Sequence, residues 1–219
     1  MSTAVRREAR AARREELSGA GPVREERPPA LFPGATGRFA LFGEVLLTGL
    51  LVTIVGLGVV TMPAALAAGI RHMRRYTAAE DSRLQFFWAD VRRGLLPGAA
   101  VGAVALVATL VLLLDIDLAR SGFLPGGPVI AVVGWVGLAA VAMTLLAAAG
   151  VWTPETGWLA AVRAVPALVA SDVAGAVYLV ATAGFVGVVT WALVPLFIPA
   201  VGCAALAVVA VPVRRRGRA

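Results

Sequence analysis

The chain has 219 residues, 59% of them hydrophobic, and a formal net charge of +7 at pH 7. A soluble domain usually has an apolar share of about 45–50%, so the composition argues against one. A single cysteine (Cys203) excludes an intramolecular disulfide, and a single histidine (His72) argues against a metal site built from nitrogen and sulfur ligands. We expect no metal and no cofactor. The basic charge is all arginine, and retention at a cytoplasmic membrane face explains it better than nucleic-acid binding.

Residues 1–37 precede the apolar part of the chain. They are rich first in Arg, Glu and Ala and then in Pro and Gly, and they contain no apolar stretch. This composition is not that of a cleavable signal peptide. We predict a disordered tail.

Four segments contain no charged residue: 45–70, 94–114, 121–154 and 173–213. A bilayer core requires about 20 apolar residues as helix. The first three segments therefore fit one crossing each, and the fourth fits two, separated near Pro195 and Pro199. We predict an all-α polytopic membrane domain over residues 38–213, followed by a basic tail at 214–219. Its five transmembrane helices are expected at about 39–69, 94–114, 129–151, 173–193 and 196–213.

The first of these spans is too long for one straight crossing and too short for two. Pro63 lies inside it and predicts a kink, because proline removes a backbone donor and clashes with the preceding turn. A tilted, broken helix fits this pattern best, and a re-entrant segment is the alternative. Glu44 borders the apolar interior of this span and is therefore a weak functional candidate. The alternative is that it contacts water or caps a helix.

Two amphipathic helices are predicted outside the spans. In the first, apolar residues recur at helical spacing along 84–95 and arginines flank them, which is typical of a helix lying in the membrane interface. A helix that docks into a groove of a partner protein is the alternative. The residues of this candidate interface are Leu84, Phe87, Trp88, Val91, Arg92 and Arg93. A weaker copy follows at about 157–169.

The second span begins with three regularly spaced glycines. Gly94, Gly98 and Gly102 are spaced four apart, which favours close helix packing in lipid.

Residues 102–109 and 175–182 are identical at seven of eight positions. Each string follows a predicted amphipathic helix and begins a pair of spans. This order predicts an internal duplication with both copies in the same orientation, a parallel repeat.

Arginines near the span ends predict the orientation. Eleven lie on the side of the C-terminus and four on the other, which places the C-terminus in the cytoplasm. Five crossings would put the N-terminal tail outside, whereas a re-entrant first segment would leave both ends inside. The side of the N-terminus therefore stays open.

Motifs of catalysis are missing from the sequence. It contains no GxSxG, HExxH, P-loop or GxGxxG pattern. No ionisable residue falls in the middle of a predicted span, where proton and ion relays usually place one. We expect that the protein is not an enzyme.

The order of features over residues 37–213 resembles the YesL-like family of bacterial membrane proteins. The resemblance lies in Gly37-Arg38-Phe39, in Val-Val-Thr-Met-Pro-Ala-Ala-Leu-Ala-Ala-Gly (59–69) and in Arg-Leu-Gln-Phe-Phe-Trp-Ala-Asp-Val-Arg (83–92). Members of this family of unknown function are often encoded beside carbohydrate-uptake ABC transporters.

The resemblance implies a multi-pass protein of the bacterial plasma membrane with an accessory role. Besides the lipid bilayer, the expected partners are ABC transporter subunits, a sensor or further copies of the chain. A small transporter or channel, acting alone or as an oligomer, is the alternative.

Overall fold

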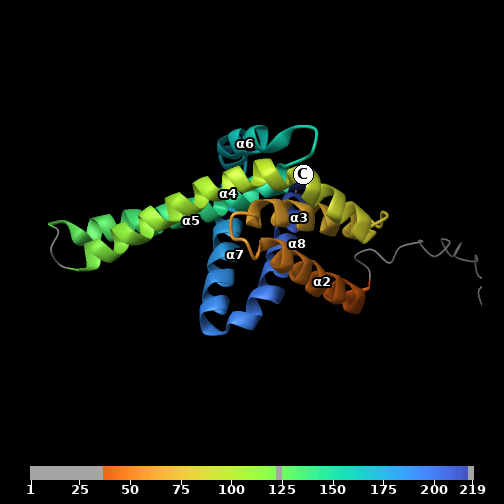
Figure 1. Cartoon of the computed structure of the whole chain (residues 1–219), viewed down its shortest axis with the longest axis horizontal. Helices are drawn as coiled ribbons and strands as arrows, with labels where there is room; N and C mark the ends of the chain where they lie inside the picture. The colour runs from red at the N-terminus through yellow and green to blue at the C-terminus, as the bar shows by residue number, and fades with distance from the viewer. Residues whose placement is uncertain (1–36, 122–124, 217–219) are drawn as a thin grey trace, which may run out of the picture. The chain divides into compact units, whose positions relative to one another are not determined.

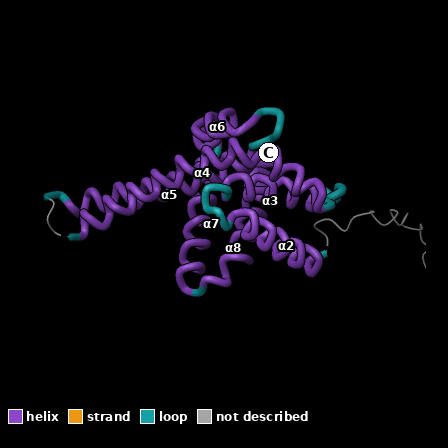
Figure 2. The backbone as a smooth tube through the Cα atoms, in the orientation of Figure 1, coloured by secondary structure: helices purple, strands orange, loops and turns teal. Residues whose placement is uncertain are grey.

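The computed structural model describes residues 37–121 and 125–216, apart from the side chains of 214–216. The described chain is helical and contains no strand (Figures 1 and 2). Five segments are long and apolar enough to cross a membrane, so this is a multi-pass helical membrane protein. The predicted tail lies outside the described residues, except for Gly37 before the first helix. The elements are α2 (Arg38–Gly56), α3 (Met62–Thr77), α4 (Leu84–Arg120), α5 (Gly127–Val151), α6 (Gly157–Ser171), α7 (Val173–Ala192), the 3₁₀ turn η2 (Val194–Leu196) and α8 (Phe197–Arg216).

The expected first span, 39–69, is two antiparallel helices and not one kinked helix. Glu44 of α2 contacts His72 of α3, and Thr48 and Val52 lie beside Gly69. Pro63 is therefore not a kink. It occupies the first turn of α3, where the missing N–H has no intrahelical partner to lose. The chain reverses before it, at residues 57–61.

The turn between α2 and α3 is tightly packed. Val59 adopts a left-handed backbone with φ of 55°, which is rare for a β-branched residue. The Thr61 hydroxyl donates to the Val55 carbonyl at 2.5 Å. On the α4 side, a Cβ added to Gly102 would overlap the Val60 carbonyl. The turn thus satisfies part of its own backbone and lies directly against α4.

Helix α4 joins two elements that were predicted separately. The expected interfacial helix 84–95 and the expected span 94–114 form one helix, about 55 Å long at 1.5 Å per residue. Its first half runs antiparallel to α3, and its second half pairs with α5. Pro97 lies inside α4, which nevertheless continues through it.

The remaining spans lie close to their predicted positions. Helix α5 covers 127–151, and α7 and α8 form a hairpin whose turn contains Pro195. Helix α8 continues to Arg216, so the first half of the expected basic tail is helical; residues 217–219 lie outside the described part. Between α5 and α6, Thr153 begins a turn, and α6 starts at Gly157.

Helices α2 and α8 approach each other through two glycines. A Cβ at Gly49 would overlap the Ile198 carbonyl, and a Cβ at Gly202 would overlap the Val45 carbonyl. The reciprocal contact allows the two backbones to touch. Because the helices run antiparallel, the start of α2 and the end of α8 lie at the same end of the helices.

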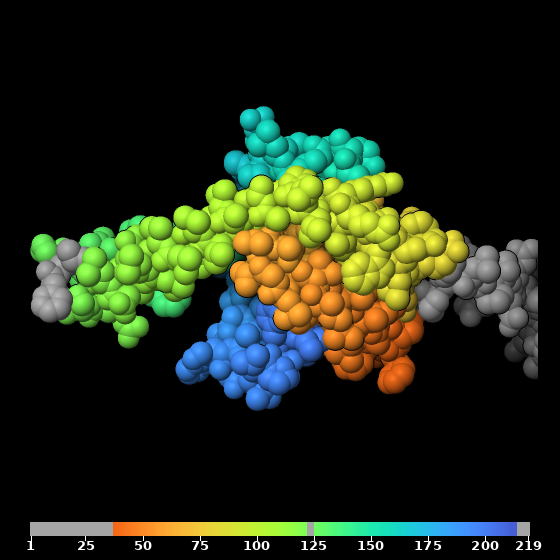
Figure 3. All heavy atoms as spheres, viewed as in Figure 1, coloured from red at the N-terminus to blue at the C-terminus, as the bar shows by residue number. Residues whose placement is uncertain are grey.

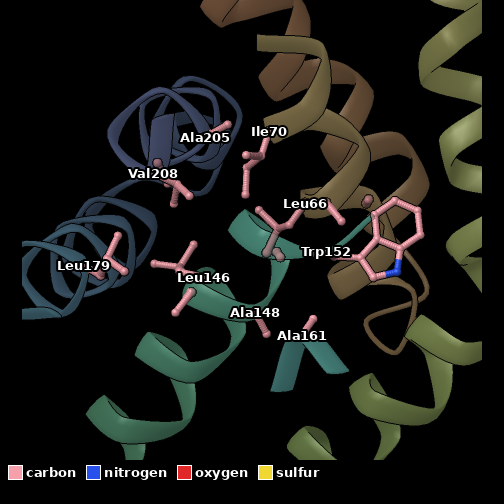
Figure 4. Close-up of a cluster of buried hydrophobic side chains, with 14 of the residues drawn as sticks. Leu66, Ile70, Leu146, Ala148, Trp152, Ala161, Leu179, Ala205 and Val208 are labelled. Carbon is pink, nitrogen blue, oxygen red and sulfur yellow. The ribbon is translucent and has the colours of Figure 1, made fainter. Parts of the chain in front are cut away.

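The core is centred on α3, which packs against α2, α4, α5 and α8. Figure 3 shows the outer side of α3, in light orange, between α2 and α4. Leu66 and Ile70 of α3 point toward Leu146 of α5, with Leu179 of α7 and Val208 of α8 beside them (Figure 4). Much of the rest of this core is alanine, which lets the helices approach closely. By contrast, many large apolar side chains of α4, α5 and α7 are exposed, as expected for helices surrounded by lipid.

The two predicted repeats have partly different structures. Helices α4 and α7 both begin at the end where α3, α5 and α8 finish, and each leads into an antiparallel pair. In the first copy the amphipathic segment is continuous with the span, whereas Asp172 separates α6 from α7 in the second. The parallel repeat stays a prediction.

Candidate functional site

Ionisable side chains of α3, α2 and α4 meet at one end of the helices. We call this group the charged layer: Glu44, Arg71, His72, Arg74, Arg75 and Asp90. Four of its members come from the last two turns of α3, where a spacing of three or four residues directs them toward different neighbours. The layer therefore connects α3 to α2, to α4 and to the end of α5.

Asp90 is the most enclosed acid of the layer, with 3% of its surface exposed. Its Oδ2 accepts from Nε of Arg71 at 3.0 Å and from Nη2 of Arg75 at 2.9 Å. Residues 71 and 75 lie one turn apart, so both guanidiniums reach the same carboxylate. Two charge-assisted bonds fasten α4 to α3.

The second ionisable contact joins α2 to α3. His72 is 1% exposed, and its Nε2 lies within hydrogen-bond distance of Glu44 Oε1. Its ring packs edge-on against Phe87, with centroids 6.4 Å apart. The structure thus places the candidate Glu44 inside a helix contact, which favours a structural role. Four buried polar atoms on α2 and α3 lack a hydrogen-bond partner within the described residues: Thr48 Oγ1, His72 Nδ1, Arg75 Nη1 and Tyr76 Oη.

The candidate interface residues of α4 face two directions. Phe87 and Val91 are buried against Leu51 and Ala68. That half of the predicted surface is therefore a protein contact and does not lie on the bilayer. Leu84 and Trp88 remain 42% and 39% exposed, and Arg92 and Arg93 are exposed beside them. Periodicity grouped these apolar residues on one helix face but could not tell which of them lipid or protein covers.

The three predicted packing glycines of α4 lie at helix contacts. A Cβ at Gly94 would lie 3.0 Å from the Trp152 ring, and one at Gly98 would lie 3.0 Å from Ala64. Gly102 meets the α2–α3 turn. The absence of a side chain at these positions leaves room for the backbone of α3 and for the indole rings of two tryptophans.

A pair of stacked tryptophans, not predicted from the sequence, packs against α4 beside the charged layer. Trp152 and Trp158 stack with centroids 5.7 Å apart. Trp158 Nε1 donates to the Gly94 carbonyl at 3.2 Å, and the Arg71 guanidinium lies 5.9 Å from the Trp152 ring centroid.

Asp90 was also not predicted as a site residue. Its position between Phe87 and Val91 on an apolar face was the available signal, because a buried acid needs a cation.

A third carboxylate, Asp81, lies in the loop before α4 and is paired on the surface. Arg83 Nε donates to its two oxygens at 2.8 and 3.0 Å. These hydrogen bonds lower the pKa of the Asp81 carboxyl below its ordinary value. The Asp81–Arg83 pair has the chemistry of the Asp90 contact without its burial, and so provides a matched control.

The arrangement fixes helices and presents a basic, aromatic surface. Within residues 37–121 and 125–216, no three His, Cys, Asp or Glu side chains are grouped so as to hold a metal. Comparison of the chain with protein-family models, with curated proteins and with solved structures finds no match.

Proposed function

We propose that the chain is a non-catalytic accessory protein of the bacterial plasma membrane that binds a partner through the exposed face of α4. We call this face the α4 stripe: Leu84, Trp88, Arg92 and Arg93. One observation carries the proposal. Trp88 keeps 39% of its surface exposed on a helix whose opposite face is fixed by Asp90, Phe87 and Val91.

Rigid presentation of these residue types suits protein recognition. Tryptophan and arginine are enriched among the residues that dominate binding energy at interfaces. Because α4 is already ordered, a partner that docks there loses little entropy in ordering it. The resemblance to YesL-like proteins suggests the kind of partner, a carbohydrate ABC-type transporter or a sensor.

The charge distribution supports a cytoplasmic position for the stripe. Arginines are retained on the cytoplasmic side of bacterial membranes. At the far end of the helices the described part of the chain has Arg120. At the end of the charged layer it has Arg38, Arg71, Arg74, Arg75, Arg83, Arg92, Arg93 and Arg163. The α4 stripe would then face the ATPase side of a transporter.

The same reasoning favours a re-entrant α2–α3 hairpin. The apolar part of α3, residues 62–70, is about 14 Å long as helix, and a bilayer core is about 30 Å thick. A hairpin that enters and returns leaves α4, α5, α7 and α8 as the crossings. Both chain ends are then cytoplasmic.

A pull-down from native membranes in gentle detergent tests the docking proposal. We expect permease or ATPase subunits of one transporter to copurify in fixed ratio with the wild type. Trp88→Ala combined with Arg92→Glu should lower their yield at least about tenfold, the effect of losing one interface anchor. Trp191→Ala is the matched control, because Trp191 is 89% exposed and lies at the end of α7, away from α4.

Two results would contradict the proposal. In one, the wild type purifies without a transporter or sensor subunit. In the other, the double variant and Trp191→Ala retain the partner equally.

A transporter is the second candidate, and the α2–α3 hairpin favours it. Broken helices with buried polar groups are typical of transporter sites, and this hairpin contains the Glu44–His72 contact. Solute flux into liposomes that contain the purified protein alone would support transport, provided that Glu44→Gln reduces it. Absence of flux would leave the accessory role as the better account.

A further inference from the structure

A cavity lies at the same end of the helices as the charged layer. Its volume is about 350 Å³, and side chains of α3, α5, α6, α7 and α8 line it. Cavities that bind small ligands measure about 300–1,000 Å³. The space is therefore sufficient for part of an amphiphilic molecule.

The chemistry of the lining divides the cavity into two parts. Met143, Leu168, Leu179 and Val208 represent its apolar walls. Its polar groups gather where α3 ends and where α6 meets α7, and they are Arg74, Ser171 and Asp172. An apolar chain with a charged head matches this division.

Arg74 provides a cation that is already held in place. Its Nη2 donates to the Gly150 carbonyl at 2.8 Å, which positions the guanidinium at the end of α5. The side chain is otherwise exposed, and its other nitrogens make no hydrogen bond within the described residues. Arginine binds phosphate oxygens through several donors at once.

Asp172, the acid of the lining, has a role of its own. Its carboxylate accepts from the backbone N–H of Gly175 at 2.9 Å and caps α7, and it makes a further interaction. The lining therefore contains one cation and one acid, and Arg74 is the group whose remaining N–H donors are directed to no other described residue and can bind an anionic headgroup.

We propose that the cavity binds one anionic phospholipid. Its phosphodiester pairs with Arg74, and one acyl chain lies between α5, α6, α7 and α8. The position in the charged layer agrees with headgroup depth, since basic pockets between membrane helices bind lipid headgroups. This site is separate from the α4 stripe and does not depend on a protein partner.

Native mass spectrometry of the delipidated protein in detergent tests the proposal. Phosphatidylglycerol should bind at one molecule per chain. Diacylglycerol, which lacks the phosphodiester, should bind about 10-fold to 100-fold more weakly, the range for loss of a charge-assisted hydrogen bond. Glycerol 3-phosphate, which lacks the chains, should not bind at the same concentration.

Variants test each half of the site. Arg74→Gln should weaken phosphatidylglycerol binding roughly 10-fold to 100-fold, and Arg74→Lys should restore most of it. Ala176→Phe should abolish binding, because Ala176 lines the cavity and the ring would fill it. The controls are Arg163→Gln and Ala174→Phe, two exposed positions that do not line the cavity.

The proposal is overturned by any of three results. Wild type and Ala176→Phe could bind phosphatidylglycerol equally, diacylglycerol could bind as tightly as phosphatidylglycerol, or glycerol 3-phosphate could bind without chains. The comparisons between ligands use the wild type, so they decide the question even if Arg74→Gln does not fold.

Discussion

Replacement of Asp90 by asparagine removes the negative charge that two guanidiniums of α3 share. The side chain keeps its size and one oxygen, so the change is mainly electrostatic. Arg71 and Arg75 would then lie partly buried beside each other without a counter-charge. The two guanidiniums would repel each other, and α4 would lose the two ion pairs that connect it to α3.

The magnitude follows from burial. Loss of one partner of a fully buried ion pair costs about 3–5 kcal/mol. The side chains of Arg71 and Arg75 are 22% and 20% exposed, so water screens part of the uncompensated charge. We expect the free energy of unfolding to fall by about 2–4 kcal/mol, which for a chain of this length lowers Tm by roughly 5–15 °C.

Thermal unfolding in detergent, followed by intrinsic tryptophan fluorescence, to which the buried Trp152 and Trp158 contribute, measures the effect. Asp81→Asn is the matched control and should leave Tm unchanged, because Asp81 and its partner Arg83 are on the surface. Replacing all three charged residues by apolar ones of similar size (Asp90→Leu, Arg71→Met, Arg75→Met) should restore much of the stability. The reasoning is refuted if Asp90→Asn unfolds at the wild-type temperature or if Asp81→Asn is equally destabilised.

Three further experiments test the fold. Gly102→Leu should prevent normal packing of the α2–α3 turn and lower Tm by at least about 5 °C, whereas Gly187→Leu should not, because a Cβ there has nothing within 4 Å; equal Tm values would exclude close packing at Gly102. Val59→Gly should be neutral or stabilising, since the strain of a left-handed valine, about 1–3 kcal/mol, exceeds the entropy cost of glycine; a large fall in Tm would show that the turn has another backbone. Cysteines placed singly at Ser2 and Ala219, with Cys203 replaced by serine, should show the same accessibility to a membrane-impermeant thiol reagent in intact cells, and opposite accessibility would exclude the re-entrant hairpin.

Hydropathy was sufficient to predict the helical membrane class and the positions of α5, α7 and α8. Each of these is an apolar segment of one membrane thickness, and Pro195 marks the turn between the last two. These features are local, so they can be read from a window of the sequence.

The α2–α3 hairpin could not be predicted in the same way. Residues 39–69 have the length of one tilted span, and Pro63 suits either a kink or the first turn of a new helix. The contacts that fix the reversal lie beyond residue 69, in the part of α3 that continues to Thr77. There His72 contacts Glu44, and Arg71 and Arg75 contact Asp90. Those partners are distant in sequence, and composition gives no information about them.

The contact of Gly102 with the Val60 carbonyl has a consequence for biosynthesis. The chain leaves the ribosome from its N-terminus, so α2 and α3 reach the membrane before the glycine that receives their turn. Until then α2 is long enough to cross the bilayer by itself, and the apolar part of α3 is too short to bring the chain back across. In the proposed re-entrant arrangement, the α2–α3 turn therefore gains its packing partner only after Gly102 has been synthesised, so the hairpin is completed after its own two helices have been made.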